Sequence, residues 1–575
     1  MNAERLLAHY EQIADMPDAI GRLRRFILDL AVRGKLVPQD SKEEPAAELL
    51  KQIAAEKVRL VNSGKIKREK SLPKIEPDDA PFPSPSGWEW VRLYSVGNIF
   101  NGNSINSAEK DEKYAGVDGL PYIATKDVGY GRDPLDYENG IRIPAGEKNF
   151  KVAHRGAVLI CAEGGSAGKK CGLTDQDICF GNKLFANELY GQIPSRFILY
   201  FYSSSTFKAL FDALMSGIIG GVSIAKFIEL PVPLPPLSEQ HRIVAKVDEL
   251  MALCDRLEAA RAEREATRDR LAASSLARLN APDPDTFQDD ARFLLNALPA
   301  LTTRPDQIKQ FRQAILNLAV RGKLVPQESK DEPAGELLNR IAKEKGQTRH
   351  PVVTIRHDDE PYPVPETWKW TALDQLIVAG PQNGISPKPT NREDAPKAIT
   401  LTATTSGTFN PAYFKHVEAS IPRDSEFWLR DGDLLFQRGN TREYVGMAAV
   451  YQGPPHSFLF PDLIMKVRLS AHVCLGFAHL ASISPPAREF LSANASGAQA
   501  TMPKINQTTL VSLPMPLPPL AEQHRIVAKV DELMALCDQL EASLTDTAAT
   551  RGRLLDALLA EALEPAEVRE VEAVA

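Results

Sequence analysis

A segment of 30 residues occurs twice in this chain almost unchanged, at residues 230–259 and again at residues 513–542. The two copies are identical at 27 of the 30 positions, and both contain the sequence EQHRIVAKVDELMALCD. A close internal repeat of this length indicates two copies of one structural unit, because the same sequence is expected to fold in the same way in both places. The chain is therefore predicted to consist of two repeats.

A second phrase is repeated near the start of each half. Residues 27–57 and residues 315–345 are identical at 24 of 31 positions and share the sequence AVRGKLVPQ. In each repeat, a stretch with little similarity to its counterpart separates this phrase from the 30-residue segment. The order of framework, insert and framework, found twice, indicates a tandem duplication in which the framework was kept and the inserts diverged.

The 30-residue segment is predicted to form a long helix after a proline-rich beginning. Pro231, Pro233, Pro235 and Pro236 exclude a helix there, and Ser238 is a suitable N-cap. Apolar side chains then recur every three or four residues in both copies, which predicts a seam that is buried against a partner helix. The seam positions are Ile243, Val247, Leu250, Cys254, Leu257, Ile526, Val530, Leu533, Cys537 and Leu540. The first helix could reach about 40 residues, or ~60 Å.

The phrase at residues 27–57 and its repeat predict the partner helix, with apolar residues at the same spacing. Gly34 and Gly322 are expected to end this helix, because glycine readily adopts the left-handed C′ conformation. A short second helix is predicted to have Pro45 or Pro333 in its first turn. Each pair of repeated segments is expected to pack as an antiparallel coiled coil that serves as a spacer. A homodimeric coiled coil would show the same apolar spacing.

Composition limits the possible classes of protein. A chain of 575 residues is too long for one hydrophobic core, and 43% hydrophobic with 25% charged residues is ordinary for a soluble protein. No apolar run approaches the ~20 residues that span a bilayer, and the N-terminus does not resemble a secretory signal. Six cysteines without CxxC spacing are expected to be reduced thiols, which favours a cytoplasmic location. A net charge of −7 argues against a uniformly basic nucleic-acid binder.

No catalytic motif is complete in this sequence. The stretch AEGGSAGKK at residues 162–170 has the Gly-Lys pair of a P-loop but lacks its first glycine and its final hydroxyl residue. The stretch NPAY at residues 410–413 resembles the target-amine motif of amino-methyltransferases but lacks the second proline. No cluster of histidine and cysteine has the spacing of a metal site. We therefore expect no catalytic centre, no metal and no cofactor in this chain.

Each insert mixes short apolar runs with turn-forming residues, which predicts two α/β domains and an α+β class for the whole chain. Strands are predicted at residues 120–125, 156–163, 398–404, 433–439 and 463–469, and a helix at residues 198–215.

The polar loops between these elements contain the types of side chain that contact phosphates and base edges in DNA complexes. The candidate DNA-contacting residues are Asn103, Lys126, Tyr130, Arg132, Lys169, Lys170, Lys183, Asn383, Lys388, Arg392, Gln437, Arg438, Asn440 and Arg442. In residues 88–229, 15 basic residues stand against 16 acidic ones. The same side chains are common in solvated loops, so a binding surface requires local clustering in the fold.

The phrases AVRGKLVPQ and LPPLxEQHRIVAKVDELMALC, in this order and twice, resemble those of the specificity (S) subunits of bacterial type I restriction–modification systems. The resemblance covers the whole chain. It implies that each insert is a target-recognition domain for one half of an asymmetric, bipartite DNA sequence, and that the helical framework sets the gap. It also implies a non-catalytic chain that binds two methyltransferase (M) subunits, which use S-adenosylmethionine. Two restriction (R) subunits would use ATP and Mg²⁺.

The expected organisation has five parts. Residues 1–87 form an N-terminal helical segment, and residues 88–229 form the first target-recognition domain. Residues 230–345 form a central framework with a long helix, and residues 346–512 form the second target-recognition domain. Residues 513–575 form a C-terminal helical region, related to the first domain's framework by a pseudo-twofold repeat.

Two segments depart from a continuous rod. Residues 281–306 combine turn-forming residues with a short apolar helix, and residues 564–575 form an acidic tail.

Three other functions remain open on the sequence alone. They are the recognition subunit of a phage-defence methylation system without a restriction partner, a coiled-coil scaffold whose inserts bind proteins, and a self-contained methyltransferase.

Overall fold

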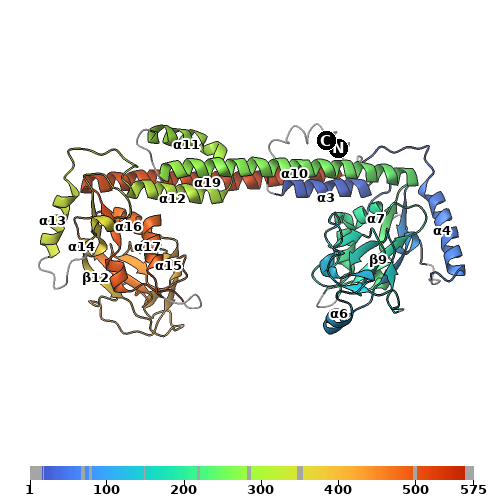
Figure 1. Ribbon diagram of the computed structural model, residues 1–575, viewed down its shortest axis with the longest axis horizontal. Helices are drawn as coiled ribbons and strands as arrows, with labels where there is room; N and C mark the ends of the chain where they lie inside the picture. The colour runs from blue at the N-terminus through green and yellow to red at the C-terminus, as the bar shows by residue number, and fades with distance from the viewer. Residues whose placement is uncertain are drawn as a thin grey trace. The chain divides into compact units, whose positions relative to one another are not determined.

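The computed structural model describes residues 16, 18–66, 72–76, 80–147, 149–216, 220–280, 286–345, 354–496 and 502–563. It divides into two compact units, the first made of Met1–Glu265 and Ala548–Ala575 and the second of Ala266–Thr547. Each unit contains one insert, folded as a mixed α/β domain, together with helices of the framework (Figure 1). The predicted α+β class is confirmed. The predicted turn at residues 281–285 and the acidic tail at residues 564–575 lie outside the described residues.

The framework of the first unit contains α3 (Ala19–Val32), α4 (Ala46–Asn62) and the first part of α10 (Leu237–Asn280). Gly34 follows α3 with a φ of +66°, which confirms the predicted C′ glycine. Pro45 is the N-cap of α4, one residue before the first turn in which it was expected. α4 continues to Asn62, beyond Lys57, where the repeated phrase ends.

The long helix α10 has 44 residues, close to the predicted length. It begins at Leu237, so the prediction of Ser238 as its N-cap is wrong. The N–H of Gln240 donates to the carbonyl of Pro236 at 2.9 Å, which closes the first turn directly after the proline run. Proline is compatible with this position, because the backbone N–H that it lacks would have no partner within the helix.

The α10 seam packs against α3 in the antiparallel direction, as predicted. Seam residues of α10 lie in the same core as the apolar face of α3. Arg24 in α3 lies 2.6 Å from Asp255, near the middle of α10. Beyond the end of α3, Gln39 donates to Glu239 near the beginning of α10. Later residues of one helix therefore meet earlier residues of the other.

The described residues of the first insert, together with the strand that follows it, form sheets with strand orders β1-β10, β2-β9-β6-β7 and β4-β3-β8-β5. The predicted helix at residues 198–215 is divided into two helices. The first ends at Tyr202 with Ser203 as its C-cap, and Ser204 caps the second by accepting the N–H of Phe207 at 3.1 Å. The elements are β1 (Glu89–Arg92), α5 (Leu93–Val96), β2 (Gly97–Asn101), α6 (Ser107–Lys113), β3 (Leu120–Ile123), η2 (Thr125–Asp127), β4 (Arg142–Ile143), β5 (Val152–Ala153), β6 (Val158–Cys161), β7 (Cys171–Leu173), β8 (Ile178–Phe180), β9 (Leu184–Leu189), α7 (Ser195–Tyr202), α8 (Ser205–Leu214), α9 (Ile224–Phe227) and β10 (Pro231–Leu234).

The framework of the second unit repeats this pattern. Arg312 lies 2.6 Å from Asp538, and Gln327 donates to Glu522, so α12 and α19 are also antiparallel. The last part of α10 joins their core, together with the predicted short apolar helix, which is α11. The framework elements are α11 (Phe287–Leu301), α12 (Pro305–Val320), α13 (Ala334–Lys345), η3 (His357–Asp359) and α19 (Leu520–Leu563).

The second insert has sheets with strand orders β11-β18, β12-β17-β15-β16 and β13-β14. The predicted strand at residues 398–404 is wrong in its second half, where a short helix, α15, replaces it. The elements are β11 (Lys369–Ala372), α14 (Leu373–Leu376), β12 (Ile377–Asn383), β13 (Lys397–Ile399), α15 (Thr402–Thr405), β14 (Phe414–His416), β15 (Leu434–Gln437), β16 (Ala448–Val450), β17 (Ile464–Leu469), α16 (Leu475–Ile483), α17 (Pro485–Ala493), α18 (Gln507–Val511) and β18 (Pro514–Leu517).

A buried glutamate in each unit joins the two repeated phrases to the start of the insert. Glu239 is 1% exposed, and its two carboxylate oxygens accept the indole N–H of Trp88 at 2.9 Å and the amide of Gln39 at 2.7 Å. Glu522 makes the same contacts with Trp368 and Gln327 in the second unit. Burial raises the pKa of Glu239, and the two donors partly offset this effect. The repeated phrases are thus held together where each insert leaves the framework.

Replacing Glu239 by alanine is expected to lower the free energy of unfolding of the first unit by about 2 kcal/mol, because two buried donors lose a charged acceptor. Urea unfolding followed by tryptophan fluorescence measures the change. Glu239→Gln keeps an acceptor and should lose clearly less. Glu249→Ala, on an exposed part of the same helix, should stay within about 0.5 kcal/mol of the unmodified protein. A Glu239→Ala variant as stable as Glu249→Ala would contradict this role.

Candidate nucleic-acid interface

The lysines predicted in the first domain gather around the loop that joins β6 to β7. Lys169 and Lys170 end this loop, and Lys170 Nζ donates to the carbonyl oxygen of Thr125 in η2 at 3.3 Å. Lys126 is the next residue of η2. The carbonyl of Lys183, in the turn between β8 and β9, accepts a backbone N–H from the β6–β7 loop at 2.8 Å. Three loops that are distant in the sequence therefore bring four lysines to the end of the β2-β9-β6-β7 sheet at which β6 is joined to β7.

The glycine-rich part of the β6–β7 loop is a tight turn. Gly164 and Gly168 have φ angles of +84° and +66°, which favour glycine. Their N–H groups donate to the carbonyls of Gly220 and Cys161, each at 2.9 Å. A P-loop instead directs its backbone N–H groups at phosphates. The hydrogen bonding of this turn therefore agrees with its rejection as a nucleotide site.

Two other predicted residues of the first domain have protein partners. The side-chain oxygen of Asn103 accepts the N–H of Lys151 at 2.9 Å. The guanidinium of Arg132 lies 2.6 Å from Asp255 in α10. Both contacts lie within the first unit, and the second attaches a loop of the insert to the framework. DNA contact by Asn103 and Arg132 stays a prediction.

The loop that joins β15 to β16 takes the equivalent place in the second domain, because β2-β9-β6-β7 and β12-β17-β15-β16 have corresponding strand orders. Arg438, Asn440 and Arg442 lie in this loop. The N–H of Arg438 donates to the carbonyl of Leu463 at 2.7 Å, in the turn before β17. Both domains thus carry a basic loop at the same position, with lysines in the first and arginines and an asparagine in the second.

Gln437 is fully buried, so the prediction that it contacts DNA is wrong. Its Nε2 donates to the carbonyl of Leu401 at 2.9 Å and to the Thr404 hydroxyl at 3.0 Å, and its Oε1 accepts Asn440 Nδ2 at 2.6 Å. These bonds tie α15 to the end of β15. Gln437 therefore supports the β15–β16 loop from the interior of the domain. The next residue, Arg438, is the first with an accessible side chain.

The remaining predicted residues of the second domain divide into two groups. Asn383 ends β12 and pairs with Met465 of β17, so it lies at the same end of the sheet as the β15–β16 loop. Lys388 and Arg392 are exposed on a separate segment, in which Arg392 forms an ion pair with Asp394 at 2.7 Å. Asp462 joins this segment to the β15–β16 loop, because its carboxylate accepts the hydroxyl of Ser386 and its carbonyl accepts the guanidinium of Arg438 at 3.4 Å. DNA contact by these three residues stays a prediction.

Lys504 is a further basic residue at this position that sequence reasoning missed. It is exposed, and its backbone forms bridges with Gly439 in the β15–β16 loop and with Ser496. The sequence around Lys504 has no motif or repeated phrase that would indicate this proximity. Only the pairing of segments that are distant in the sequence places Lys504 beside Arg438 and Asn440.

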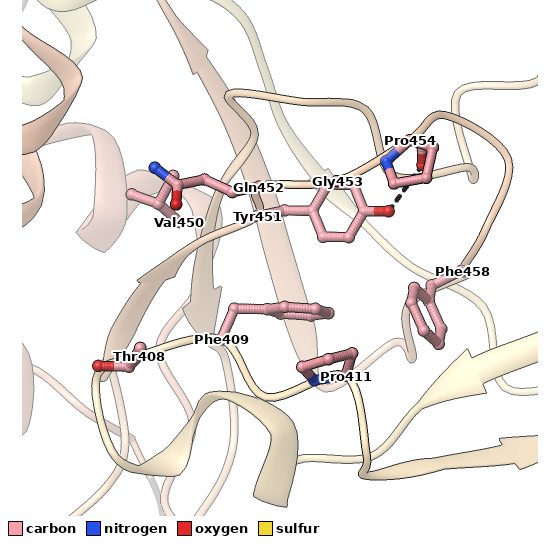
Figure 2. Close-up of a pocket in the computed structure, with 9 residues that line it drawn as sticks. All are labelled: Thr408, Phe409, Pro411, Val450, Tyr451, Gln452, Gly453, Pro454 and Phe458. Atoms are coloured by element: carbon pink, nitrogen blue, oxygen red, sulfur yellow. Dashed lines mark hydrogen bonds between the residues drawn. The ribbon is translucent and has the colours of Figure 1, made fainter.

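The second domain also contains a cavity of about 300 Å³. Figure 2 shows the aromatic rings of Phe409, Tyr451 and Phe458 around it, with Pro411 of the NPAY stretch at its edge. The side chain of Asn410, the first residue of that stretch, accepts the N–H of Ala412 at 3.0 Å. This is a turn in which the amide serves the backbone. The stretch therefore has a structural explanation that requires no methyltransferase chemistry.

In the described part of the chain, the side chains and helices can be compared with the requirements of a metal site and of a membrane-spanning helix. There, no group of three or more His, Cys, Asp or Glu side chains is placed to hold a metal ion. Among the residues that the structure describes, no helix has the length and apolar character needed to cross a bilayer. The six cysteines are free thiols, as predicted, and five of them are buried.

Comparison with known proteins gives consistent matches. Residues 85–265 and 365–548 match the family described as the type I restriction modification DNA specificity domain. The EcoEI specificity subunit of Escherichia coli is 30% identical over 95% of this chain and 94% of its own length. The EcoAI specificity subunit of Escherichia coli is 30% identical over 94% and 93%. The solved HsdS subunit from Thermoanaerobacter tengcongensis is 18% identical, with a TM-score of 0.42 over 84% of this chain and 98% of that chain.

Proposed function

Because this chain belongs to the family of type I restriction–modification DNA specificity subunits, we propose that it reads a two-part DNA sequence, with one half-site for each insert domain. The observation that carries this proposal is the repetition of one sheet with a basic loop at the equivalent position in both domains. Basic and amide side chains supply phosphate contacts and base-edge hydrogen bonds. Because the two loops carry different side chains, the two half-sites are expected to differ in sequence.

The helical framework would set the number of base pairs between the half-sites. α10 and α19 have 44 residues each, which corresponds to about 66 Å at the usual helical rise. Two half-sites face the same side of the duplex when their centres lie about one helical turn, ~34–36 Å, apart. A helix of fixed length therefore favours a gap of fixed length.

We assign the chemistry to partner subunits. Two methyltransferase subunits would methylate adenine with S-adenosylmethionine, and two restriction subunits would use ATP and Mg²⁺. This chain would supply no catalytic residue, and the complex would act in the cytoplasm, where the host DNA is located. The duplicated framework supports the number two, because two nearly identical surfaces can each bind one copy of the same partner.

The surface of the repeated helix supports this assignment. Residues 239–255 and 522–538 are identical, including positions whose side chains are exposed in the described part of the chain. Leu253 and Leu536 are equivalent, and they are 42% and 47% exposed. An exposed leucine repeated in the same sequence context is suited to an apolar contact with a partner. We propose that each leucine contacts one methyltransferase subunit.

Replacing both leucines by aspartate is expected to weaken assembly with the methyltransferase at least tenfold at each site, because a charge would enter an apolar interface. Analytical ultracentrifugation gives the stoichiometry, and each single variant should retain one bound subunit. The matched control replaces Glu249 and its equivalent Glu532, which are exposed on the same helices, by alanine. Full assembly by the double aspartate variant would exclude these leucines from the interface.

DNA binding by the assembled methyltransferase tests the function itself. Fluorescence anisotropy would compare a duplex carrying the motif methylated in the host with a scrambled duplex of equal length. We expect a preference of at least about 10³-fold for the motif. A protein-binding scaffold predicts equal, weak affinity for both duplexes, and that result would overturn the proposed function.

A further inference from the structure

Tyr130 is the most exposed large apolar side chain of the described residues, at 64%. It lies in the loop after η2, within the lysine-bearing end of the first domain. Lys170 Nζ is 5.7 Å from the centroid of its ring, and this lysine also binds the carbonyl of Thr125. The ring is thus largely exposed and has the ammonium group of Lys170 beside it. Its ring face and its cationic neighbours are suited to a nucleobase and its phosphate.

The backbone on both sides of Tyr130 is fixed. The carbonyl of Gly129 accepts the N–H of Cys171 at 3.1 Å, and the N–H of Gly131 donates to the carbonyl of Cys171 at 2.9 Å. Tyr130 therefore lies beside β7 as an added residue of the sheet. Gly131 has a φ of +91°, and a Cβ atom there would lie 2.4 Å from the hydroxyl of Ser203. Only glycine fits at this position, so the loop is held close to the end of α7.

An ion pair fixes the next residue to the framework. Arg132 lies 2.6 Å from one carboxylate oxygen of Asp255, and Arg24 of α3 lies 2.6 Å from the other. Both arginines hold the pKa of Asp255 below its ordinary value. The equivalent Asp538 in the second unit pairs with Arg312, the counterpart of Arg24. The additional arginine therefore comes from the first insert, in the same loop as Tyr130.

A ring held in this way is pre-organised for binding. A side chain on a mobile loop loses conformational freedom when it contacts a ligand, and a fixed loop avoids most of that cost. The bonds of Gly129, Gly131 and Arg132 fix the backbone while the tyrosine ring stays exposed. The geometry is therefore that of a rigid support for one aromatic contact.

On the basis of the proposed DNA-reading function, we propose that Tyr130 makes an aromatic contact with a base of the half-site read by the first domain. Arg132 is a positioning residue for this contact, because its ion pair with Asp255 fixes the loop to α10. Lys170 accompanies the ring and would contact the adjacent phosphate. Specificity at one position of the first half-site thus depends on Tyr130. Recognition of the second half-site does not depend on it.

Tyr130→Ala tests the contact in the assembled methyltransferase. We expect about tenfold weaker binding to the full motif, or ~1.4 kcal/mol, with unchanged affinity for nonspecific DNA and an unchanged salt dependence. Tyr130→Phe keeps the ring and should stay within about twofold. Tyr413→Ala, at the exposed tyrosine of the second domain, is the matched control and should have no effect. Loss of affinity for specific and nonspecific DNA alike would overturn the base contact.

A double-mutant cycle tests the role of Arg132. Arg132→Ala should weaken motif binding about threefold in the unmodified protein and have no further effect in the Tyr130→Ala background, because it acts through the ring. An equal loss in both backgrounds would show that Arg132 does not position Tyr130. If the unmodified complex prefers no DNA sequence, the proposed function fails. If it prefers the motif and Tyr130→Ala binds equally well, only the assignment of Tyr130 fails.

Discussion

Exchanging residues 88–229 for the insert of another specificity subunit is expected to change one half of the recognised DNA sequence completely, while the other half and the gap stay the same. The structural reason is how the insert joins the framework. β1 and β10 pair in the register Glu89 with Leu234, so the insert begins and ends at adjacent strands. β11 and β18 enclose the second insert in the corresponding way, with Lys369 paired to Leu517.

The exchange is measured by sequencing methylated adenines in cells that express the hybrid chain. The matched control exchanges the second insert between β11 and β18, and it should change only the other half-site. Methylation of the original motif should fall to background in both hybrids. If a single exchange altered both halves together, the two domains would not read DNA independently, and one domain for each half-site would be wrong.

Deleting one heptad from both long helices is expected to shorten the gap by about three base pairs. Residues 262–268 of α10 and residues 545–551 of α19 are at equivalent positions of the repeat. Seven residues correspond to about 10 Å of helix, and base pairs are spaced about 3.4 Å apart. A deletion of seven residues nearly preserves the phase of the apolar seam, so both ends of each long helix can keep their apolar faces toward the helices that they pack against.

Methylated-motif sequencing again provides the measurement, with both half-sites expected to remain unchanged. The matched control deletes the heptad from α10 alone, which leaves α19 at its full length and should reduce assembly. A paired deletion that methylates the original motif with the original gap would show that the helices do not set the spacing.

Much of the framework could be predicted from the sequence, because helix periodicity and helix-ending glycines act locally. The α10 seam and the C′ position of Gly34 are examples. Local patterns gave wrong predictions where tertiary contacts determine the secondary structure or the burial of a side chain. Residues 402–404 were expected to be the second half of a strand and instead belong to α15, because the side chain of Gln437 binds this turn from another strand. The buried position of Glu239 was missed for the same reason.

The candidate interface was less predictable, because it depends on which loops meet. The residue types were evident from the sequence, and the structure gathers Lys126, Lys169, Lys170 and Lys183 through backbone hydrogen bonds between distant segments. β15 is buried on both faces, so strand alternation could not show that the side chain of Gln437 lies inside. A sequence pattern identifies a polar loop, but the fold decides which of its side chains are accessible.

The central claim is that this chain alone determines a two-part DNA target. Its most direct test is modification-sensitive sequencing of the host genome, with and without the gene for this chain. We predict one methylated-adenine motif with two unlike halves and a fixed gap, which disappears when the gene is deleted. A continuous or palindromic motif that depends on this gene, or a bipartite motif that persists after its deletion, would contradict the claim.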